Sequence, residues 1–565
     1  MVRIYAALFP LLPLRLCWAA TVTVNTTSGL LQGVVDGTVM SFKGVRFGQP
    51  PVRWEPPVAF TSTSVQNAST LPPACVQQFN GALASLDQKI FNNPSDPPAE
   101  SEDCLFLNVW APSPAGQGLP VVLWIYGGGL SFGTGSIPMY DGTYFAQNQS
   151  VILVSFNYRT NVFGFPASPD LALAENNLGF LDQELAMQWV QQNIAQFGGD
   201  PSKVTLMGQS AGALSTSAAY VRHGPGTAPF RAAIMFSGPQ VSQPSATDFS
   251  TFNSFASALK CGNEAGAARL SCLRKVPAAD MRTYLDSIPE LFRPVVDNVT
   301  FFTDPLERIR AGQSSGVPFI VGNMQDDGTL FSINVTSLSA FLSSTTNGML
   351  NAADVSPVQA LYPGLNNTQV IVEATKDFRF LCPAQLWTAA AVEAGISDVY
   401  RYSYGAVFAD DQPFPNAGAW HSSELPEVFG TYDAATATAA ESTLSNTMQT
   451  IISNFIKDPT TSPATNWAKY VPGSGSTTLA MLAYSGNVDM DNVVDSVQSD
   501  SLDSSCAYWD QLLDITGPNT SASSVSSASG SSSTSANTRG TSAALDLRPS
   551  MGLLWTIALA VLLIR

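Results

Sequence analysis

The fold prediction starts from Val204-Thr-Leu-Met-Gly-Gln-Ser-Ala-Gly212. In this stretch an apolar β run enters Gly208-x-Ser210-x-Gly212, and small residues suited to a packed helix follow. This order is typical of a nucleophile elbow, a strained strand-to-helix turn that pushes a serine hydroxyl outward between closely packed glycines. An ordinary glycine-rich turn is the alternative, because the chain contains 42 glycines. The strand before the motif and the helix after it favour the elbow, with Ser210 as the nucleophile.

A serine hydroxyl becomes an effective nucleophile only when a base takes its proton. The chain has two histidines that could do so, His223 and His421. His223 follows the elbow closely in Arg-His-Gly-Pro-Gly, a sequence typical of a surface turn. His421 lies far downstream, after a late β run, and elbow folds place serine, acid and histidine in that chain order. His421 is therefore the predicted base.

An acid is then expected between the serine and the histidine, at the end of a strand. The segment Pro318-Phe-Ile-Val-Gly-Asn-Met-Gln-Asp-Asp-Gly328 supplies Asp326 and Asp327 after an apolar run. A solvated Asx turn is the alternative reading of this Asp-Gly sequence. On these residues alone, either aspartate could be the acid.

Backbone donors for a developing oxyanion are predicted in Trp124-Ile-Tyr-Gly127-Gly128-Gly129, which follows another buried strand. Consecutive glycines have no side chains, so their N–H groups can point into a site. The N–H of Ala211, directly after the nucleophile, is the second predicted source. A flexible loop is the alternative for the glycine triplet, and the nearby elbow argues against it.

Apolar runs alternate with helical patterns over one globular unit, residues 21–515. The predicted β runs are 121–126, 151–156, 204–207, 232–236, 318–321 and 399–402. Between the second and third runs, residues 178–197 carry apolar side chains at helical spacing. This alternation predicts an α/β fold with a mostly parallel central sheet and helices on both faces.

Further motifs resemble the type-B carboxylesterase and lipase family, which includes the cholinesterases and fungal lipases. They are Ser101-Glu-Asp-Cys-Leu-Phe-Leu-Asn-Val109, Asn157-Tyr-Arg159 with Gly164-Phe165, Asn177-Leu-Gly-Phe-Leu-Asp-Gln183, Phe197-Gly-Gly-Asp-Pro201 and Phe236-Ser-Gly238. The resemblance implies the α/β-hydrolase fold. It places the acid immediately before a glycine, at Asp327, the base at His421, and the oxyanion donors at Gly128, Gly129 and Ala211.

The combined prediction is a carboxylesterase that forms an acyl-enzyme on a small-molecule ester, with no cofactor and no metal. A lipase acting on glycerides and a non-catalytic cell-surface adhesion domain on the same fold are the alternatives, because a fold does not guarantee an activity. Acidic residues outnumber basic ones 43 to 26, giving a net charge of -17. That balance argues against a nucleic-acid partner, which needs clustered Lys and Arg.

Three departures from the family pattern bear on the site. The family acid is usually Glu, one methylene longer than Asp327, and the residue before the nucleophile is commonly Glu where this chain has Gln209. The segment 75–104 contains no Trp, so choline esters are disfavoured, because a quaternary ammonium group needs an aromatic face or a negative charge. This segment forms either an apolar flap, as in lipases, or a bridged surface loop; its apolar residues are Phe79, Leu83, Leu86, Ile90 and Phe91.

Both ends of the chain carry processing signals. Residues 1–20 have one early cation, an apolar run and terminal small residues, which predicts a secretory signal peptide. Residues 516–541, rich in Ser, Thr, Ala and Gly, form a predicted stalk. Residues 542–565 combine a small-residue site, a spacer and a hydrophobic end, the pattern of a GPI-anchor signal. The predicted location is therefore outside the cell, with membrane contact only through this lipid anchor.

Cysteines and glycosylation sequons agree with export. Six cysteines remain after removal of the signal peptide, and they allow 15 pairings. The family resemblance implies the pairs Cys75–Cys104, Cys261–Cys272 and Cys382–Cys506. The predicted glycosylation sites are Asn25, Asn67, Asn148, Asn298, Asn334, Asn366 and Asn519.

Overall fold

The computed structural model describes residues 20–242, 248–262, 264–346, 348–473, 475–484 and 490–514. The predicted stalk and anchor signal, nearly all of the predicted signal peptide, and Asn519 lie outside these residues. No helix in the described ranges is both long enough and apolar enough to cross a membrane.

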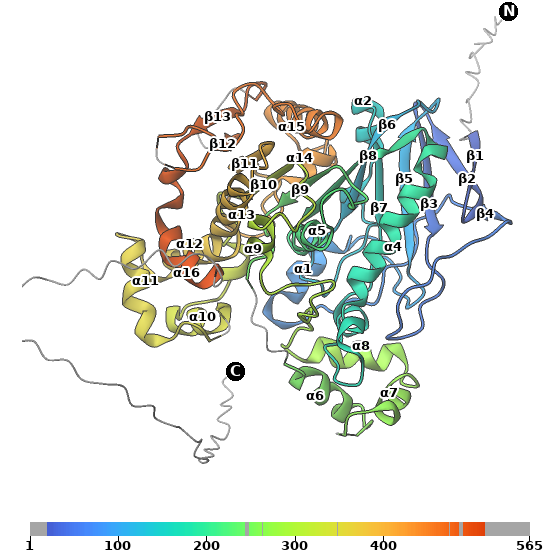
Figure 1. Cartoon of the computed structure of the whole chain (residues 1–565), viewed down its shortest axis with the longest axis horizontal. Helices are drawn as coiled ribbons and strands as arrows, with labels where there is room; N and C mark the ends of the chain where they lie inside the picture. Colours follow the sequence, from blue (N-terminus) through green and yellow to red (C-terminus); the bar gives the residue numbers. More distant parts are fainter. Residues whose placement is uncertain are drawn as a thin grey trace, which may run out of the picture. The chain divides into compact units, whose positions relative to one another are not determined.

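One mixed sheet of 13 strands organises the described chain (Figure 1). Its order is β1 (Ala20–Thr26), β2 (Gly29–Asp36), β3 (Val39–Arg46), β5 (Phe106–Pro112), β7 (Ile152–Phe156), β6 (Leu119–Ile125), β8 (Gly199–Gln209), β9 (Ala232–Phe236), β10 (Phe319–Met324), β11 (Val399–Tyr404), β12 (Leu479–Leu482) and β13 (Val494–Val497), and β4 (Val65–Asn67) pairs with β2. From β7 to β12 every neighbouring pair is parallel, whereas the pairs from β1 to β7 along the sheet and the β12–β13 pair are antiparallel.

The predicted α/β fold is thereby confirmed, and the six predicted β runs correspond to β6 to β11. These strands consist almost entirely of buried residues, which explains why they read as unbroken apolar runs rather than alternating ones. The carboxyl ends of parallel strands meet at one edge of the sheet, where ligand sites of α/β folds lie.

Helices cover both faces of the sheet (Figure 1). One face carries α4 (Leu178–Asn193), α5 (Ala211–Arg222), α9 (Pro305–Arg310) and α13 (Cys382–Glu393). The other carries α2 (Thr143–Gln149), α14 (Leu425–Phe429) and α15 (Ala439–Lys457). The predicted helical segment 178–197 divides into α4 and a terminal 3-10 turn, which stops where Gly198 adopts a left-handed conformation, φ 90°.

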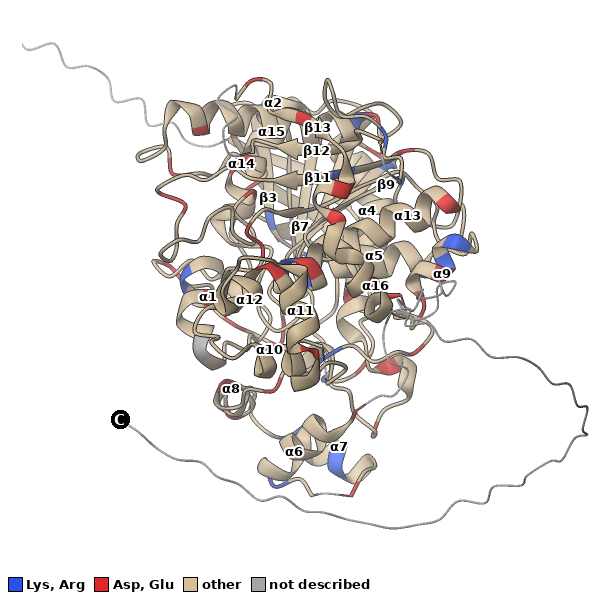
Figure 2. Ribbon diagram, turned by 90° about the vertical axis from the view of Figure 1, so that its left-hand side faces the viewer, with Lys and Arg blue, Asp and Glu red and all other residues tan. Residues whose placement is uncertain are grey.

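The remaining helices lie outside this three-layer core. They are α1 (Ala84–Phe91), α3 (Asn161–Gly164), α6 (Ser250–Ala258), α7 (Ala267–Leu273), α8 (Ala278–Ser287), α10 (Leu338–Thr345), α11 (Val355–Leu361), α12 (Asn367–Lys376) and α16 (Cys506–Leu513). A second, smaller apolar cluster holds α6, α7 and α8 together and is distinct from the main core. Figure 2 shows acidic and basic residues spread thinly among uncharged ones.

Candidate active site

The sharpest turn of the site lies between β8 and α5. Ser210 stands there with φ 56° and ψ -120°, a strained conformation for a residue with a side chain. A Cβ at Gly208 would overlap the carbonyl group of Gly212, and a Cβ at Gly212 would overlap the carbonyl oxygen of Ile125. Only glycine fits on either side of the serine, so the sequence motif and the turn geometry require each other.

His421 and Asp327 form a buried pair beside this turn. The Nδ1 atom of His421 lies 2.7 Å from Oδ1 of Asp327, and the two residues are 2% and 0% exposed. The other carboxylate oxygen, Oδ2, accepts hydrogen bonds from the hydroxyl of Ser237 at 2.9 Å and the backbone N–H of Met324 at 2.7 Å. Three segments far apart in sequence, at 237, 324–327 and 421, therefore meet where the imidazole is held.

Asp326 faces a different partner. Its Oδ2 accepts the backbone N–H of Ala419 at 2.9 Å, and burial raises the pKa of this carboxyl group. Its role in the geometry is to hold the segment before His421 against the end of β10. Of the two adjacent aspartates, the structure brings Asp327 to the histidine.

The second ring nitrogen of His421 contacts Gln209. Because Asp327 accepts at Nδ1, that nitrogen carries the proton, and Nε2 offers a lone pair. The side-chain Nε2 of Gln209 lies 3.1 Å from Nε2 of the ring and donates to it. The hydroxyl of Ser210 makes no hydrogen bond to any described residue. The Gln209 amide therefore occupies the Nε2 lone pair of His421, which is the lone pair that would receive a proton from the serine.

The glycine loop after β6 lies directly against the turn. A Cβ at Gly127 would stand 3.1 Å from Cβ of Ser210. Gly128 and Gly129 have φ of 98° and 62°, which favour glycine. No acceptor from the described chain bonds the N–H groups of these two glycines, and the first N–H of α5, from Ala211, has no intrahelical partner. Three donors are thus available near the serine.

Aromatic rings enclose the histidine. The rings of Phe331 and Phe380 lie 4.9 Å and 4.7 Å from the His421 ring. Phe380 also adjoins the nucleophile turn, because a Cβ at Gly238 would be 3.7 Å from its ring and 3.5 Å from the carbonyl oxygen of Ser210. This arrangement places apolar surface directly beside the imidazole.

The 75–104 segment packs against the glycine loop and against Trp420. Phe79 stacks on Phe132 of the glycine loop at 4.8 Å, and Phe91 lies 6.0 Å from Phe132. Phe91 also lies 6.5 Å from Trp420, the neighbour of His421. Apolar side chains of this segment therefore rest over the site, whereas its action as a moving lid stays a prediction.

His223 lies elsewhere, at the C-terminal end of α5. Its Nε2 is 3.2 Å from a carboxylate oxygen of Glu184 on α4, so it links two helices.

A groove of about 470 Å³ lies among β2, β3, β5 and α2. Residues such as Val34, Lys43 and Trp110 line it, and neither Ser210 nor His421 does. Cys382, Cys506 and Asp510 lie close enough to hold a metal, but the two sulfurs are joined in a disulfide.

Residues 20–509 match the sequence profile of the Carboxylesterase family. The chain belongs to the carboxylesterase family. It is 33% identical to the chlorogenic acid esterase of Aspergillus niger, over 78% of this chain and 83% of that protein. It is 33% identical to the para-nitrobenzyl esterase of Bacillus subtilis (79% and 92%) and 31% identical to secreted lipase 1 of Botryotinia fuckeliana (84% and 91%).

A solved PNB esterase structure agrees with the fold of this carboxylesterase. Its TM-score is 0.70 at 29% sequence identity, covering 87% of this chain and 99% of that one. The predicted α/β-hydrolase fold and family are therefore confirmed, and the chain is a carboxylic ester hydrolase.

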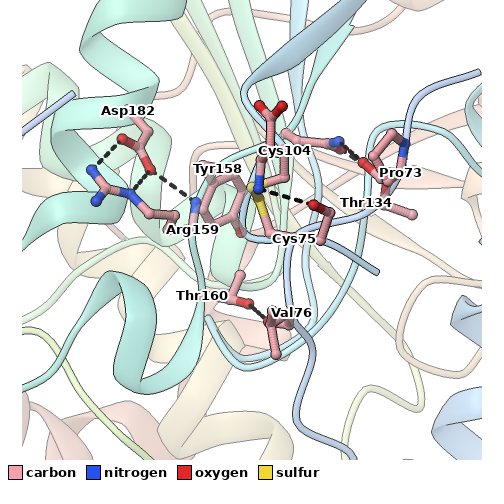
Figure 3. Close-up of a disulfide and its surroundings, with 12 residues drawn as sticks. Pro73, Cys75, Val76, Cys104, Thr134, Tyr158, Arg159, Thr160 and Asp182 are labelled. Carbon is pink, nitrogen blue, oxygen red and sulfur yellow. Dashed lines mark hydrogen bonds and ion pairs between the residues drawn. A yellow bond between two sulfur atoms is a disulfide. The ribbon is translucent and has the colours of Figure 1, made fainter. Parts of the chain in front are cut away.

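The carboxylesterase contains the three disulfides that the family resemblance implies: Cys75–Cys104, Cys261–Cys272 and Cys382–Cys506. The first closes the segment that covers the site (Figure 3). Beside it, the hydroxyl of Thr160 donates to the carbonyl of Val76 at 3.1 Å, and Arg159 pairs with Asp182 at 2.8 Å. The hydrogen bond to Val76 fixes the Cys75 end of the covering segment to the core.

Sequence reasoning missed several residues of this carboxylesterase site. Ser237 lies in the motif Phe236-Ser-Gly238, to which the sequence assigned no role, and its hydrogen bond to Asp327 reveals one. Phe380 comes from a segment without a motif, and only its packing against His421 reveals it. Glu424 and Glu427, just after the histidine, are 1% and 0% exposed, and no described residue bonds their carboxylate oxygens. Burial raises the pKa of both carboxyl groups well above the usual range. Their spacing after His421 gave no signal that they would be buried.

Proposed function

We propose that Ser210, His421 and Asp327 perform ester hydrolysis as a catalytic triad. The hydroxyl of Ser210 attacks the ester carbonyl while Nε2 of His421 takes its proton. Asp327 keeps the proton on Nδ1 and stabilises the imidazolium. The imidazolium then protonates the leaving alcohol, and a water activated by the same nitrogen releases the acid from the acyl-enzyme.

One observation carries this proposal: the buried 2.7 Å contact between His421 and Asp327 beside a strained, glycine-flanked serine. The hydrogen bond from Gln209 must give way, because Nε2 of the ring offers one lone pair. A rotation of the Gln209 amide would free that position for the Ser210 hydroxyl. Loose catalytic hydrogen bonds of this kind are common before substrate binds.

We propose that Gly128, Gly129 and Ala211 hold the oxyanion. Their N–H groups have no acceptor among the described residues, and two of them belong to consecutive left-handed glycines. Donors fixed in advance stabilise the tetrahedral intermediate without having to reorganise.

The proposed substrates are carboxylic esters with a moderately apolar acid or alcohol. The rings of Phe331 and Phe380 support this, because they present apolar surface beside His421. Hydrolysis of glycerides is the second candidate, favoured by the apolar segment over the site and by the likeness to secreted lipase 1. The non-catalytic alternative has no comparable support, since the serine, histidine, acid and free donors lie together.

A panel of p-nitrophenyl esters of graded acyl length, assayed with and without an oil–water interface, tests this proposal. An esterase hydrolyses the dissolved short esters, whereas a lipase is activated by the interface and prefers long chains. Ser210→Ala is the control for background hydrolysis. Wild-type activity no greater than that of Ser210→Ala on every ester would reject the proposed function.

We also propose that the enzyme is exported, glycosylated and attached to the cell surface by a GPI anchor. The predicted domains are a signal peptide at 1–20, a catalytic domain at 21–515, a stalk at 516–541 and an anchor signal at 542–565. Two features support export: three disulfides, which persist in oxidising compartments, and exposed asparagines in the six described sequons, Asn25, Asn67, Asn148, Asn298, Asn334 and Asn366. Phosphatidylinositol-specific phospholipase C should release activity from intact cells; activity found entirely in the medium before treatment would contradict the anchor.

A further inference from the structure

An arginine without a counter-ion lies beside the proposed catalytic centre. Arg379 belongs to a π-helical turn, Asp377–Leu381, between α12 and α13, a type of turn that is frequent at functional sites. Its guanidinium carbon lies 5.2 Å from the centroid of the Phe331 ring. Phe331 in turn contacts His421, and Phe380, next to the arginine in sequence, contacts both. The charge is thus two ring contacts from the imidazole.

A second arginine approaches from another segment. Arg293 lies in the irregular segment that follows α8. Gln78 and Asn80 hold this segment, because their side chains donate to the carbonyl oxygen of Glu290. Between those two donors stands Phe79, which stacks on the glycine loop at Phe132. The stretch that carries Arg293 therefore borders the segment covering the active site.

The side chain of neither arginine has an ion pair or a hydrogen bond within the described chain. Nine other arginines in that part of the protein do have ion pairs with carboxylates: Arg46, Arg53, Arg159, Arg222, Arg269, Arg274, Arg282, Arg310 and Arg401. With 43 acidic residues in the chain, counter-ions are plentiful elsewhere. Two cations left unpaired near one site leave room for an external anion.

The positive charge of Arg293 acts on Arg379. Both side chains are exposed to solvent, yet surrounding protein lowers the pKa of each. The pKa of Arg379 falls to about 10, first through burial and then through the positive charge of Arg293. Two like charges that act on each other repel, and an anion bound between them relieves that repulsion.

We propose that Arg379, assisted by Arg293, binds an ionised carboxylate carried by the substrate, so that the enzyme favours esters with a second, free acid group. This inference rests on the ester hydrolysis proposed above. The planar guanidinium group can stack on Phe331 and still present its N–H edge, whose geometry matches both oxygens of a carboxylate. The ester carbonyl would meanwhile lie at Ser210, with the acid group on either its acyl or its alcohol side.

Two matched substrate pairs locate the acid group. On the acyl side, the 4-nitrophenyl monoester of adipic acid is compared with 4-nitrophenyl hexanoate. On the alcohol side, 4-butyryloxybenzoate is compared with 4-butyryloxybenzamide. Within each pair the reacting ester is the same and the charge differs, so the ratio of the two kcat/KM values reports recognition of the carboxylate.

The variants are Arg379→Gln, Arg379→Lys and Arg293→Gln. The matched control is Arg308→Gln, because Arg308 also has no ion pair in the described chain and stacks on an aromatic ring, Phe302, at 3.9 Å, but on α9. Arg379→Gln should lower the charged-to-neutral ratio of one pair about 10- to 100-fold, the range of a lost charge-assisted hydrogen bond. Arg379→Lys should retain part of the preference, Arg293→Gln should lower it less, and Arg308→Gln should leave the ratio unchanged.

The outcomes separate this inference from the proposed function. If the wild type hydrolyses the neutral esters but shows no charge preference in either pair, or if Arg379→Gln leaves the ratio unchanged, the arginine inference is wrong and the esterase proposal stands. If the wild type hydrolyses none of the four esters above the Ser210→Ala background, the proposed function itself fails.

Discussion

Replacing Asp327 by Asn tests the proposed triad through its hydrogen bonds. Oδ2 of Asp327 accepts two hydrogens, from Ser237 and from the backbone of Met324. In the variant, an amide NH₂ at the Oδ2 position would face two donors. The amide oxygen must therefore occupy that position. The NH₂ group then points at Nδ1 of His421, which has to accept rather than donate.

That reversal moves the imidazole proton to Nε2, where it blocks transfer from Ser210. A histidine held in the wrong tautomer by such a replacement costs about 10⁴-fold in kcat, or roughly 5.5 kcal/mol of transition-state stabilisation. The assay is steady-state hydrolysis of p-nitrophenyl butyrate at neutral pH, with circular dichroism to establish that the variant is folded.

Asp326→Asn is the matched control, because it is the same change one residue away. Its Oδ2 accepts a hydrogen bond from Ala419, which an amide oxygen can also accept, so most activity should remain. The reasoning is refuted if folded Asp327→Asn retains more than about a tenth of wild-type kcat, far above the expected loss, or if Asp326→Asn loses as much activity.

Two further predictions concern the buried residues Gln209 and Glu427. Gln209→Glu places a carboxylate at Nε2 of His421 and favours the imidazolium, so the acid limb of the kcat/KM profile should move to higher pH by about one unit; an unchanged limb, or one moved to lower pH, would contradict this. Because the pKa of Glu427 is raised in the folded protein, its carboxyl group ionises at a lower pH in the unfolded chain than in the folded one. The free energy of unfolding therefore falls as the pH rises above about 4.3. Glu427→Gln should reduce the loss of unfolding free energy between pH 5 and pH 8 by about 1 kcal/mol or more; denaturant titrations at both pH values that show equal losses in both proteins would exclude the effect.

The central fold could be predicted because its physical causes are local. The strands β6 to β11 are buried on both faces and therefore appear as apolar runs. Gly208 and Gly212 appear in the sequence because no side chain fits there. The antiparallel strands β1, β2, β3 and β5 gave no comparable signal, since the exposed and buried residues of strands such as β1 and β2 follow no unbroken apolar pattern.

The site could be predicted only in part, because its remaining features depend on tertiary contacts. Motif spacing could not choose between Asp326 and Asp327; the family resemblance chose Asp327, and the structure brings that side chain to the histidine. The contact of Gln209 with His421 depends on how two distant segments meet. Arg379 looks like an ordinary surface cation in the sequence, and only its ring contact with Phe331 reveals its place beside the site.

Covalent labelling tests the central claim most directly. The intact protein is treated with a fluorophosphonate, activity and intact mass are followed together, and the modified peptide is sequenced by tandem mass spectrometry. We expect one adduct per chain, on Ser210, which appears in step with the loss of esterase activity and is absent from Ser210→Ala. An adduct on another residue, or full inactivation with Ser210 unmodified, would contradict the claim.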